Sequence, residues 1–298
     1  MSEGGDFDRG DLPSIYRAAS ESAQRGQDLL LRLTKWRLRF VVLAALAGVL
    51  YSVEALETLL QRSFAALSLA LFLGALASEV LLLNERPDKA WYSGRALAES
   101  IKTLSWRFMV CAEPFPKIMP LVEAERSFRV ALREILSLHP VRLVPEESPQ
   151  ITEKMEAVRA SNLDCRMRFY MQHRIIAQQR WYSEGARVAE RKSWRWKRCL
   201  IGLEVAGAGG ALFVLMGFGF PDFGGVLAAV IAGCVAWVEV RQFDSLAEAY
   251  SLTAAELALI HDSGSAVETE EVWSRYVVSA EQGISREHTM WLARRSFH

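Results

Sequence analysis

The 298-residue sequence lacks the short signatures of common enzymes. It has no GxSxG nucleophile turn, no GxxxxGK[ST] phosphate-binding loop and no HExxH zinc motif. Its four cysteines and five histidines are scattered and form no CxxC or HxxxH pair, so neither a disulfide framework nor a metal site is expected. The sequence therefore predicts a protein that is not an enzyme, has no cofactor and resides in a reducing compartment.

An excess of one charge is missing too, because 35 basic residues balance 35 acidic ones. This balance argues against a nucleic-acid partner. Charge is instead distributed unevenly: it is dense over most of the chain and nearly absent from four apolar stretches. These stretches are Phe40–Val53, Ser63–Leu83, Cys199–Phe220 and Phe223–Val240.

The lengths of these stretches favour membrane helices, since crossing a bilayer takes about 20 apolar residues. The second and third stretches reach that length, and the fourth is slightly short. The first is short unless Tyr51–Leu60 continues it. The alternative is a set of buried helices in a soluble protein, but a chain of this size lacks the volume to surround four such runs.

The four stretches form two close pairs. The segment Glu54–Arg62 links the first pair, and Pro221 with Asp222 predicts a tight turn in the second. We therefore expect an all-α membrane protein with two transmembrane helical hairpins, that is, four transmembrane helices, and with long cytoplasmic helical extensions.

Basic residues indicate the orientation of the hairpins. They crowd the outer ends of all four stretches, whereas the two hairpin tips together hold only Arg62. The positive-inside rule then predicts a multi-pass inner-membrane protein with both termini and the middle region in the cytoplasm. Tryptophans near the ends of the stretches are typical of an aromatic belt: Trp36, Trp91, Trp194, Trp196 and Trp237.

Each hairpin is flanked by amphipathic helical patterns, which indicates a divergent duplication. The flanking patterns cover Ser14–Phe40 and Asp88–Val110 around the first hairpin, then Leu163–Leu200 and Phe243–His261 around the second. This organisation predicts a polar tail at 1–13, a first unit at 14–113, a proline-rich linker with short helices at 114–160, and a second unit at 161–298.

Two motifs carry a family resemblance. One is the W-Y-S-x-x-A-R-x-A-E pattern at Trp181–Glu190, which has a relative in WYSGRALAE at Trp91–Glu99. The other is S-R-E-H-T-x-W at Ser285–Trp291. With the hairpins, they resemble the SLATT family, two-transmembrane effector domains associated with nucleotide-making SMODS enzymes and nucleotide-sensing SLOG domains. The chain is similar to a tandem of such units, at about 10–140 and 160–298.

The resemblance implies a bacterial membrane effector in a nucleotide-signalled anti-phage conflict system, pore-forming or otherwise membrane-perturbing. It implies an upstream nucleotide sensor or nucleotidyltransferase as a partner, besides the lipid bilayer, and it supplies no catalytic residues. Two alternatives stay open: a non-conducting scaffold or anchor that assembles cytoplasmic partners, and a housekeeping ion channel.

Acidic residues within the apolar stretches are the first candidate site. Glu79, Glu204 and Glu239 lie toward the cytoplasmic ends of their helices. Ionisable residues in a membrane segment face a bundle interior or water, so an oligomer with these acids in its lumen would favour cations. The alternative is that they pair at the interface with one of three arginines: Arg86, Arg198 or Arg241.

Small residues at every fourth position predict close packing of membrane helices. They are Ala66, Ala70, Gly74 and Ser78 in the second stretch, and Gly225, Ala229 and Gly233 in the fourth. Contacts within one hairpin are favoured over contacts between subunits. Four helices are too few to enclose a wide aqueous path, so a pore would require several subunits or a large rearrangement, and we expect a homo-oligomer.

The terminal motif consists of Ser285, Arg286, Glu287, His288 and Trp291. Glu287 interrupts an apolar stripe at helical spacing that runs from Trp273 through Val277, Ala280 and Ile284 to Trp291. It would pair with an arginine of the long helix at Leu163–Leu200 and fix its register, or lie at a solvated edge.

Overall fold

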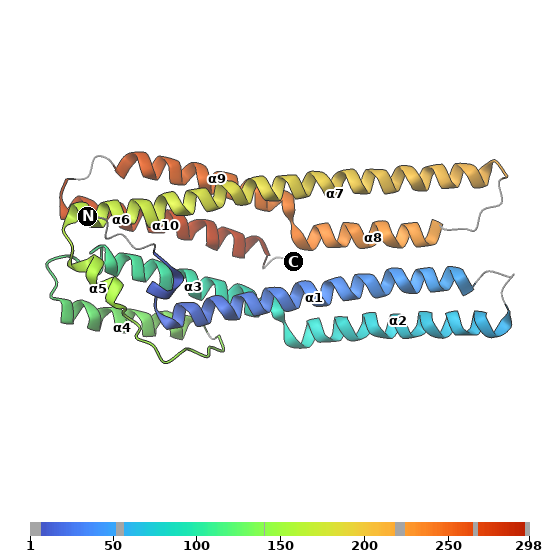
Figure 1. Cartoon of the computed structure of the whole chain (residues 1–298), viewed down its shortest axis with the longest axis horizontal. Coiled ribbons are helices and arrows are strands. Elements are labelled where there is room, and N and C mark those ends of the chain that lie inside the picture. The colour runs from blue at the N-terminus through green and yellow to red at the C-terminus, as the bar shows by residue number, and fades with distance from the viewer. Residues whose placement is uncertain (1–6, 52–56, 140, 218–223, 265–267, 296–298) are drawn as a thin grey trace. The chain divides into compact units, whose positions relative to one another are not determined.

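The computed structural model describes residues 7–51, 57–139, 141–217, 224–264 and 268–295, and these residues form helices and loops without a strand (Figure 1). The helices in chain order are η1 (Arg9–Asp11), α1 (Ser14–Tyr51), α2 (Thr58–Glu85), α3 (Pro87–Met109), α4 (Leu121–Leu138), α5 (Glu153–Ala160), α6 (Leu163–Tyr170), the π-helical η2 (Met171–Ile176), α7 (Ala177–Leu215), α8 (Gly224–Arg241), α9 (Phe243–Ser263) and α10 (Glu270–Arg295). The all-helical prediction is confirmed for this part of the chain.

The chain divides into two compact units, and each takes segments from both predicted repeats. Unit 1 comprises Met1–Gln27, Asp88–Ala186 and Glu248–His298, and unit 2 comprises Asp28–Pro87 and Arg187–Ala247. Unit 2 thus holds the apolar helices, whereas unit 1 holds the amphipathic ones. Helices α1 and α7 each contribute to both units without a break.

Three helical runs are long and apolar enough to cross a membrane in the described part of the chain. They lie within Thr58–Met109, Leu163–Leu215 and Gly224–Ser263. The described part of the first predicted span ends with α1 at Tyr51, so a fourth span stays a prediction. Helix α2 begins at Thr58, inside the segment expected to link the first pair. The predicted turn at Pro221 and Asp222 lies outside the described residues.

Each apolar helix that ends a hairpin is joined to the next amphipathic helix by a single residue in the left-handed region. Arg86 separates α2 from α3 with a φ of 44°, and Gln242 separates α8 from α9 with a φ of 47°. Such a residue ends one helix and redirects the chain. The shared device supports the duplication, and it also sets the register of the two copies. Glu79 lies seven residues before the left-handed residue Arg86, whereas Glu239 lies three residues before the left-handed residue Gln242. The two acids therefore do not occupy equivalent positions in the two copies.

The segment expected to be a linker, 114–160, belongs to the hydrophobic core of unit 1. Phe115, Phe128 of α4 and Met155 of α5 are fully buried, and Phe108 of α3 packs against both phenylalanine rings. The prolines break the helices but leave short amphipathic pieces, and their apolar faces complete a core that α3 alone cannot close. The side chain of Thr152 caps α5, and that of Asn162 caps α6.

Among the side chains of unit 1 that the structure describes, three arginines are buried, and each one bonds backbone or carboxylate oxygens. Arg159 donates to the carbonyls of Phe108 and Phe115 at 3.0 and 2.8 Å, and Arg166 donates to the carbonyl of Val110 at 3.0 Å. These carbonyls lie in the last turn of α3 or just beyond it, where backbone acceptors lack helical partners. Arg166 also forms an ion pair with Glu270 of α10. The arginines thus tie α5 and α6 to the end of α3.

The third buried arginine, Arg174 of η2, pairs with Glu281 of α10, and neither side chain is more than 1% exposed. The Glu281 carboxylate accepts from Arg174 Nε and Nη2 at 2.9 and 2.7 Å, from the Tyr170 hydroxyl at 2.9 Å and from the Thr103 hydroxyl at 2.7 Å. Burial lowers the pKa of Arg174, but the Glu281 carboxylate raises it more, so the guanidinium stays charged. One carboxylate therefore joins α3, α6, η2 and α10.

Neutralising this carboxylate should destabilise unit 1. In Glu281→Gln the buried Arg174 charge loses its counter-ion, which costs about 3 kcal/mol of unfolding free energy. We expect a fall of several degrees in the apparent Tm of the full chain in detergent, measured by the melting of its helical circular dichroism. The exposed Glu256 of α9 provides the control, Glu256→Gln. Equal melting of the two variants would contradict the role of Glu281.

Candidate functional site

The interface between α1 and α2 contains the first predicted acid. Glu79 of α2 forms an ion pair with Arg37 of α1, which is none of the three arginines considered as partners above. A second contact joins the same two helices, because the Ser68 hydroxyl of α2 donates to the carbonyl of Ala44 of α1 at 3.1 Å. The acid thus lies where two helices of one hairpin meet, which favours an anchoring role over a position in a lumen.

The small residues divide between packed and open positions. Gly74 and Ser78 lie on the packed face of α2, and a Cβ at Gly74 would stand 3.2 Å from the ring of Phe40 on α1. Ala66 and Ala70 are exposed. In α8, a Cβ at Gly233 would stand 3.6 Å from the side chain of Val42 of α1, a Cβ at Gly225 would meet nothing within 4 Å, and Ala229 is half-buried. Only some of the small residues therefore take part in close packing. Gly233 of α8 packs against α1, which belongs to the other predicted hairpin.

The other two acids have a different environment from Glu79. Glu204 of α7 and Glu239 of α8 are exposed, and within the described residues neither forms an ion pair. Glu204 lies in a run of outward apolar side chains that includes Ile201 and Val205, 59% and 66% exposed. The structure does not bring the three acids together within one chain.

Helix α10 continues through the terminal motif, but the side chains of Arg286, Glu287, His288 and Trp291 lie outside the described residues; Ser285 is exposed. The preceding stripe is core: Trp273, Val277, Ala280 and Ile284 are all buried. The acid that pairs with an arginine of the long helical run is Glu281, which lies beside this stripe. The heptad-like spacing singled out Glu287, because a polar residue within a stripe is visible in the sequence and one beside it is not.

A cationic cavity of about 470 Å³ lies in unit 2, between residues that flank the apolar helices. Four cations line it, together with two tryptophans and two further residues: Lys35, Lys192, Arg195, Arg241, Trp196, Trp237, Phe243 and Cys199. Lys35 lies 5.3 Å from the ring centroid of Trp237. Within the described part of the chain no carboxylate lines this cavity, so it is suited to an anionic group.

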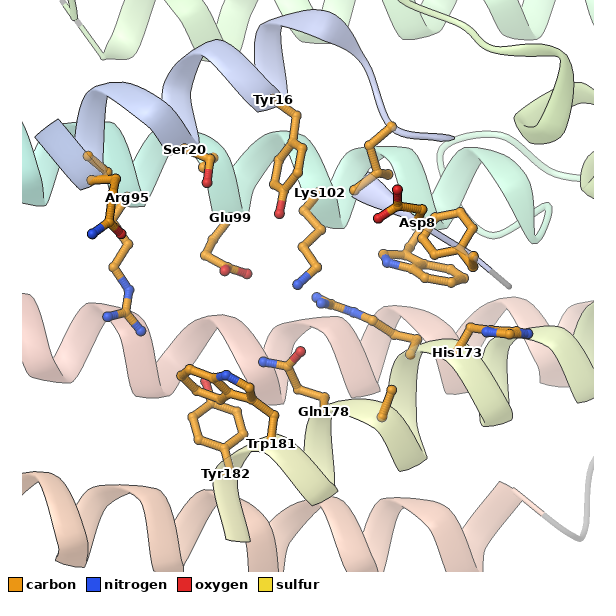
Figure 2. Close-up of a pocket in the computed structure, with 18 of the residues that line it drawn as sticks. Asp8, Tyr16, Ser20, Arg95, Glu99, Lys102, His173, Gln178, Trp181 and Tyr182 are labelled. Carbon is orange, nitrogen blue, oxygen red and sulfur yellow. The ribbon is translucent and has the colours of Figure 1, made fainter. Parts of the chain in front are cut away.

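A second cavity, of about 540 Å³, lies in unit 1. Its walls come from α1, α3, η2, α7 and α9 and combine aromatic rings with charged and amide groups. Figure 2 shows that Tyr16 and Ser20 of α1 and Glu99 and Lys102 of α3 extend in the same direction, toward Gln178 and Trp181 of α7. The sequence analysis did not identify this cavity, because its residues come from segments that are far apart in the chain.

Two buried donors in the lining of this cavity have no hydrogen-bond partner among the described residues. They are Arg174 Nη1 and the indole Nε1 of Trp106, in side chains that are 1% exposed. Nearly all buried polar groups in proteins are paired, so each exception requires an explanation. The π-helical turn η2, which presents Arg174, is a type of distortion frequently found at functional sites.

The W-Y-S motifs supply part of the wall. Trp91 of the first motif, and Trp181 and Tyr182 of the second, line the cavity. The glycines of the motifs allow close packing behind it: a Cβ at Gly94 would stand 2.9 Å from the Ala23 backbone nitrogen, and one at Gly185 would stand 2.8 Å from the Tyr250 ring. Trp91, expected in a membrane belt, is therefore a cavity residue of unit 1.

Comparison with known proteins identifies both halves of the chain. Residues 13–167 match the SMODS and SLOG-associating 2TM effector domain 3, and residues 170–291 match domain 1 of the same series. The chain belongs to the SLATT family. Two SLATT domains of different type follow one another along the chain, and this confirms the tandem arrangement predicted from the sequence. No curated protein and no solved structure matches the chain.

For a SLATT protein, the ion pair at the α1–α2 interface is a testable feature. Reversing one charge, in Arg37→Glu or Glu79→Arg, places like charges side by side and should lower the yield of folded protein in the membrane. The double exchange should restore it, with a coupling energy of about 1 kcal/mol. Membrane-fraction yield and melting temperature of the four proteins measure this coupling. If the losses simply add, the two residues do not act as a pair.

Proposed function

We propose that this SLATT protein is a bacterial integral membrane effector that perturbs or permeabilises the membrane as a homo-oligomer in a nucleotide-signalled anti-phage system. The family supports the membrane-effector part, since both matched domains are described as two-transmembrane effectors associated with SMODS and SLOG. The remaining parts of the proposal rest on the exposed surface of unit 2.

The exposure of the Glu204 carboxylate is the observation that most directly supports assembly into a homo-oligomer. In a lone chain this acid would face lipid from the middle of an apolar surface, which is costly for an ionised group. An assembly that turns this face of α7 toward neighbouring subunits or a water-filled lumen removes that cost. Glu204 and Glu239 are then the acids that a permeating ion would meet, while Glu79 is held by Arg37.

The cationic cavity supports the membrane placement. Its lysines and arginines belong to the basic outer ends of the hairpins, and they lie beside tryptophans that prefer the headgroup region. Anionic phosphates of the inner leaflet have the chemistry that such a site binds. We infer that both hairpins enter the bilayer from the cytoplasm, so that the termini and the segment between the hairpins remain there.

Topology can be measured directly. Fusions of green fluorescent protein after Pro145 and after His298 should fluoresce, and alkaline phosphatase at the same positions should be inactive, because basic residues retain these segments in the cytoplasm. Phosphatase activity at either position would contradict two hairpins with cytoplasmic ends. A phosphatase insertion at Pro221 serves as the positive control.

Ion selectivity tests the acids. In planar bilayers, wild-type protein should conduct with a preference for K⁺ over Cl⁻, and Glu204→Gln with Glu239→Gln should reduce that preference by about twofold or more. Toxicity on overexpression should fall with it. The exposed Glu85, at the end of α2, supplies the matched control Glu85→Gln, which should leave selectivity unchanged.

Two results would contradict the proposal. Normal insertion with unchanged selectivity in the double variant would remove Glu204 and Glu239 from a permeation path. A wild-type protein that inserts but neither conducts nor harms cells would favour the scaffold alternative over the effector.

A further inference from the structure

We infer that the cavity of unit 1 is a binding site for a small anionic molecule with a planar heteroaromatic ring, the chemistry of a nucleotide. Nothing in the family match assigns a ligand to these domains. The binding inference stands on the cavity alone, whereas its regulatory consequence rests on the proposed membrane effector.

Size and lining fit such a ligand. Pockets for small molecules measure roughly 300 to 1,000 Å³ and combine ring-bearing walls with a few polar groups, and this cavity holds about 540 Å³. Tyr16, Trp91, Trp181 and Tyr250 supply rings. Trp181 is 51% exposed although it belongs to unit 1, and its ring lies against Tyr250 with centroids 5.3 Å apart. It presents a face on which a second ring can stack.

The polar groups fit a ligand that carries both acceptors and donors. Arg95 and Lys102 of α3 extend into the same space as Gln178 of α7 (Figure 2). Cationic and amide side chains of this kind bind phosphate oxygens. The carboxylates of Glu99 and Asp8 also line the cavity and suit the amino groups of a base. Since the lining holds acids and bases together, it fits a nucleotide better than a simple anion.

The two unpaired donors are the strongest evidence. Glu281 occupies Nε and Nη2 of Arg174, so the guanidinium is held rigidly while its Nη1 remains without an acceptor. The buried Trp106 indole is a donor only and lacks an acceptor too. A buried donor without an acceptor costs about 1 to 3 kcal/mol. A ligand oxygen that accepts these hydrogen bonds removes the cost and explains why both donors line one cavity.

The position of the cavity in the chain suggests what binding does. Its walls include the parts of α1 and α7 that lie in unit 1, and both helices continue unbroken into the apolar segments of unit 2. The other walls come from α3 and α9. A single residue separates α3 from the apolar helix α2, and a single residue separates α9 from the apolar helix α8. A ligand that contacts all four helices therefore acts on every helix connected to the predicted spans, which is the arrangement a ligand-gated effector requires.

Binding is tested on the full chain in lipid nanodiscs by isothermal titration calorimetry. The probes are ATP, GTP, CTP, UTP, their 3′,5′-cyclic monophosphates and the cyclic dinucleotides of adenine and guanine. Adenosine and guanosine represent the ring alone, and inorganic phosphate represents the anion alone. At least one nucleotide should bind saturably at micromolar concentration and at least tenfold more tightly than its nucleoside or phosphate.

Variants place the binding in the cavity. Arg95→Gln with Lys102→Gln, and Trp181→Ala, should each weaken the best nucleotide at least tenfold without lowering the melting temperature of the free protein. Trp106→Phe should weaken it as strongly, but it also removes buried ring volume and lowers the melting temperature, so its binding is measured well below that temperature. The controls are Lys89→Gln, an exposed lysine at the start of α3, and Trp194→Ala, an exposed tryptophan in unit 2. Both controls should bind as the wild type does.

Three results would overturn the inference: no saturable binding of any probe at 1 mM, equal affinity for phosphate and nucleotide, or full binding by the cavity variants. Conductance is measured separately, with the same nucleotide added to the cytoplasmic side. A chain that binds but never conducts would refute the effector and leave the ligand site standing. A chain that conducts but does not bind would refute the ligand site.

Discussion

The carboxylate of Glu281 is the constraint on which unit 1 depends. It is fully buried, and it is stable there because four donors from Thr103, Tyr170 and Arg174 surround it. These donors come from three residues on α3, α6 and η2, so the acid on α10 can be satisfied in one arrangement of these elements only. Apolar packing of Trp273 and Val277 would tolerate small shifts between these helices, whereas an ion pair of this kind does not.

The same constraint shapes the cavity. By fixing two nitrogens of Arg174, Glu281 leaves the third nitrogen in the cavity lining, and the π-helical turn η2 sets the side chain at that position. The W-Y-S motifs then complete the wall from both repeats, with Gly94 and Gly185 allowing their helices to approach their neighbours. The W-Y-S motif, which in the sequence indicates the family, thus also has a structural role: its two copies together form part of the wall of one cavity.

Duplication in this SLATT protein is preserved in backbone geometry more than in side chains. The left-handed residues Arg86 and Gln242 end the apolar helices in the same way, and α3 and α9 begin immediately after them. Relative to these left-handed residues, Glu79 and Glu239 are about one helical turn out of register. Their environments also differ, because Glu79 forms an ion pair with Arg37 and Glu239 is exposed. The two apolar helix pairs therefore differ in the environment of their acids, although their backbones end in the same way.

Much of this architecture follows from the sequence alone. Runs without charge, amphipathic spacing and prolines located the helices, because these patterns depend on local composition; the short helices expected within 114–160 are α4 and α5. The pairing of apolar runs and the two motifs sufficed to indicate a tandem SLATT chain. The buried stripe of α10 was visible as well, since its period matches the helix.

Tertiary structure decided the partners. Glu79 pairs with Arg37, which is 42 residues away in the chain, whereas the arginines considered beforehand were those close in sequence to the three acids. The presumed linker entered the core, because Phe115 and Phe128 find a buried face that only the assembled unit provides. The cavity with its unpaired Arg174 and Trp106 donors draws on five helical elements. Local patterns report what a residue prefers, but a site made by long-range contacts exists only once those helices have met.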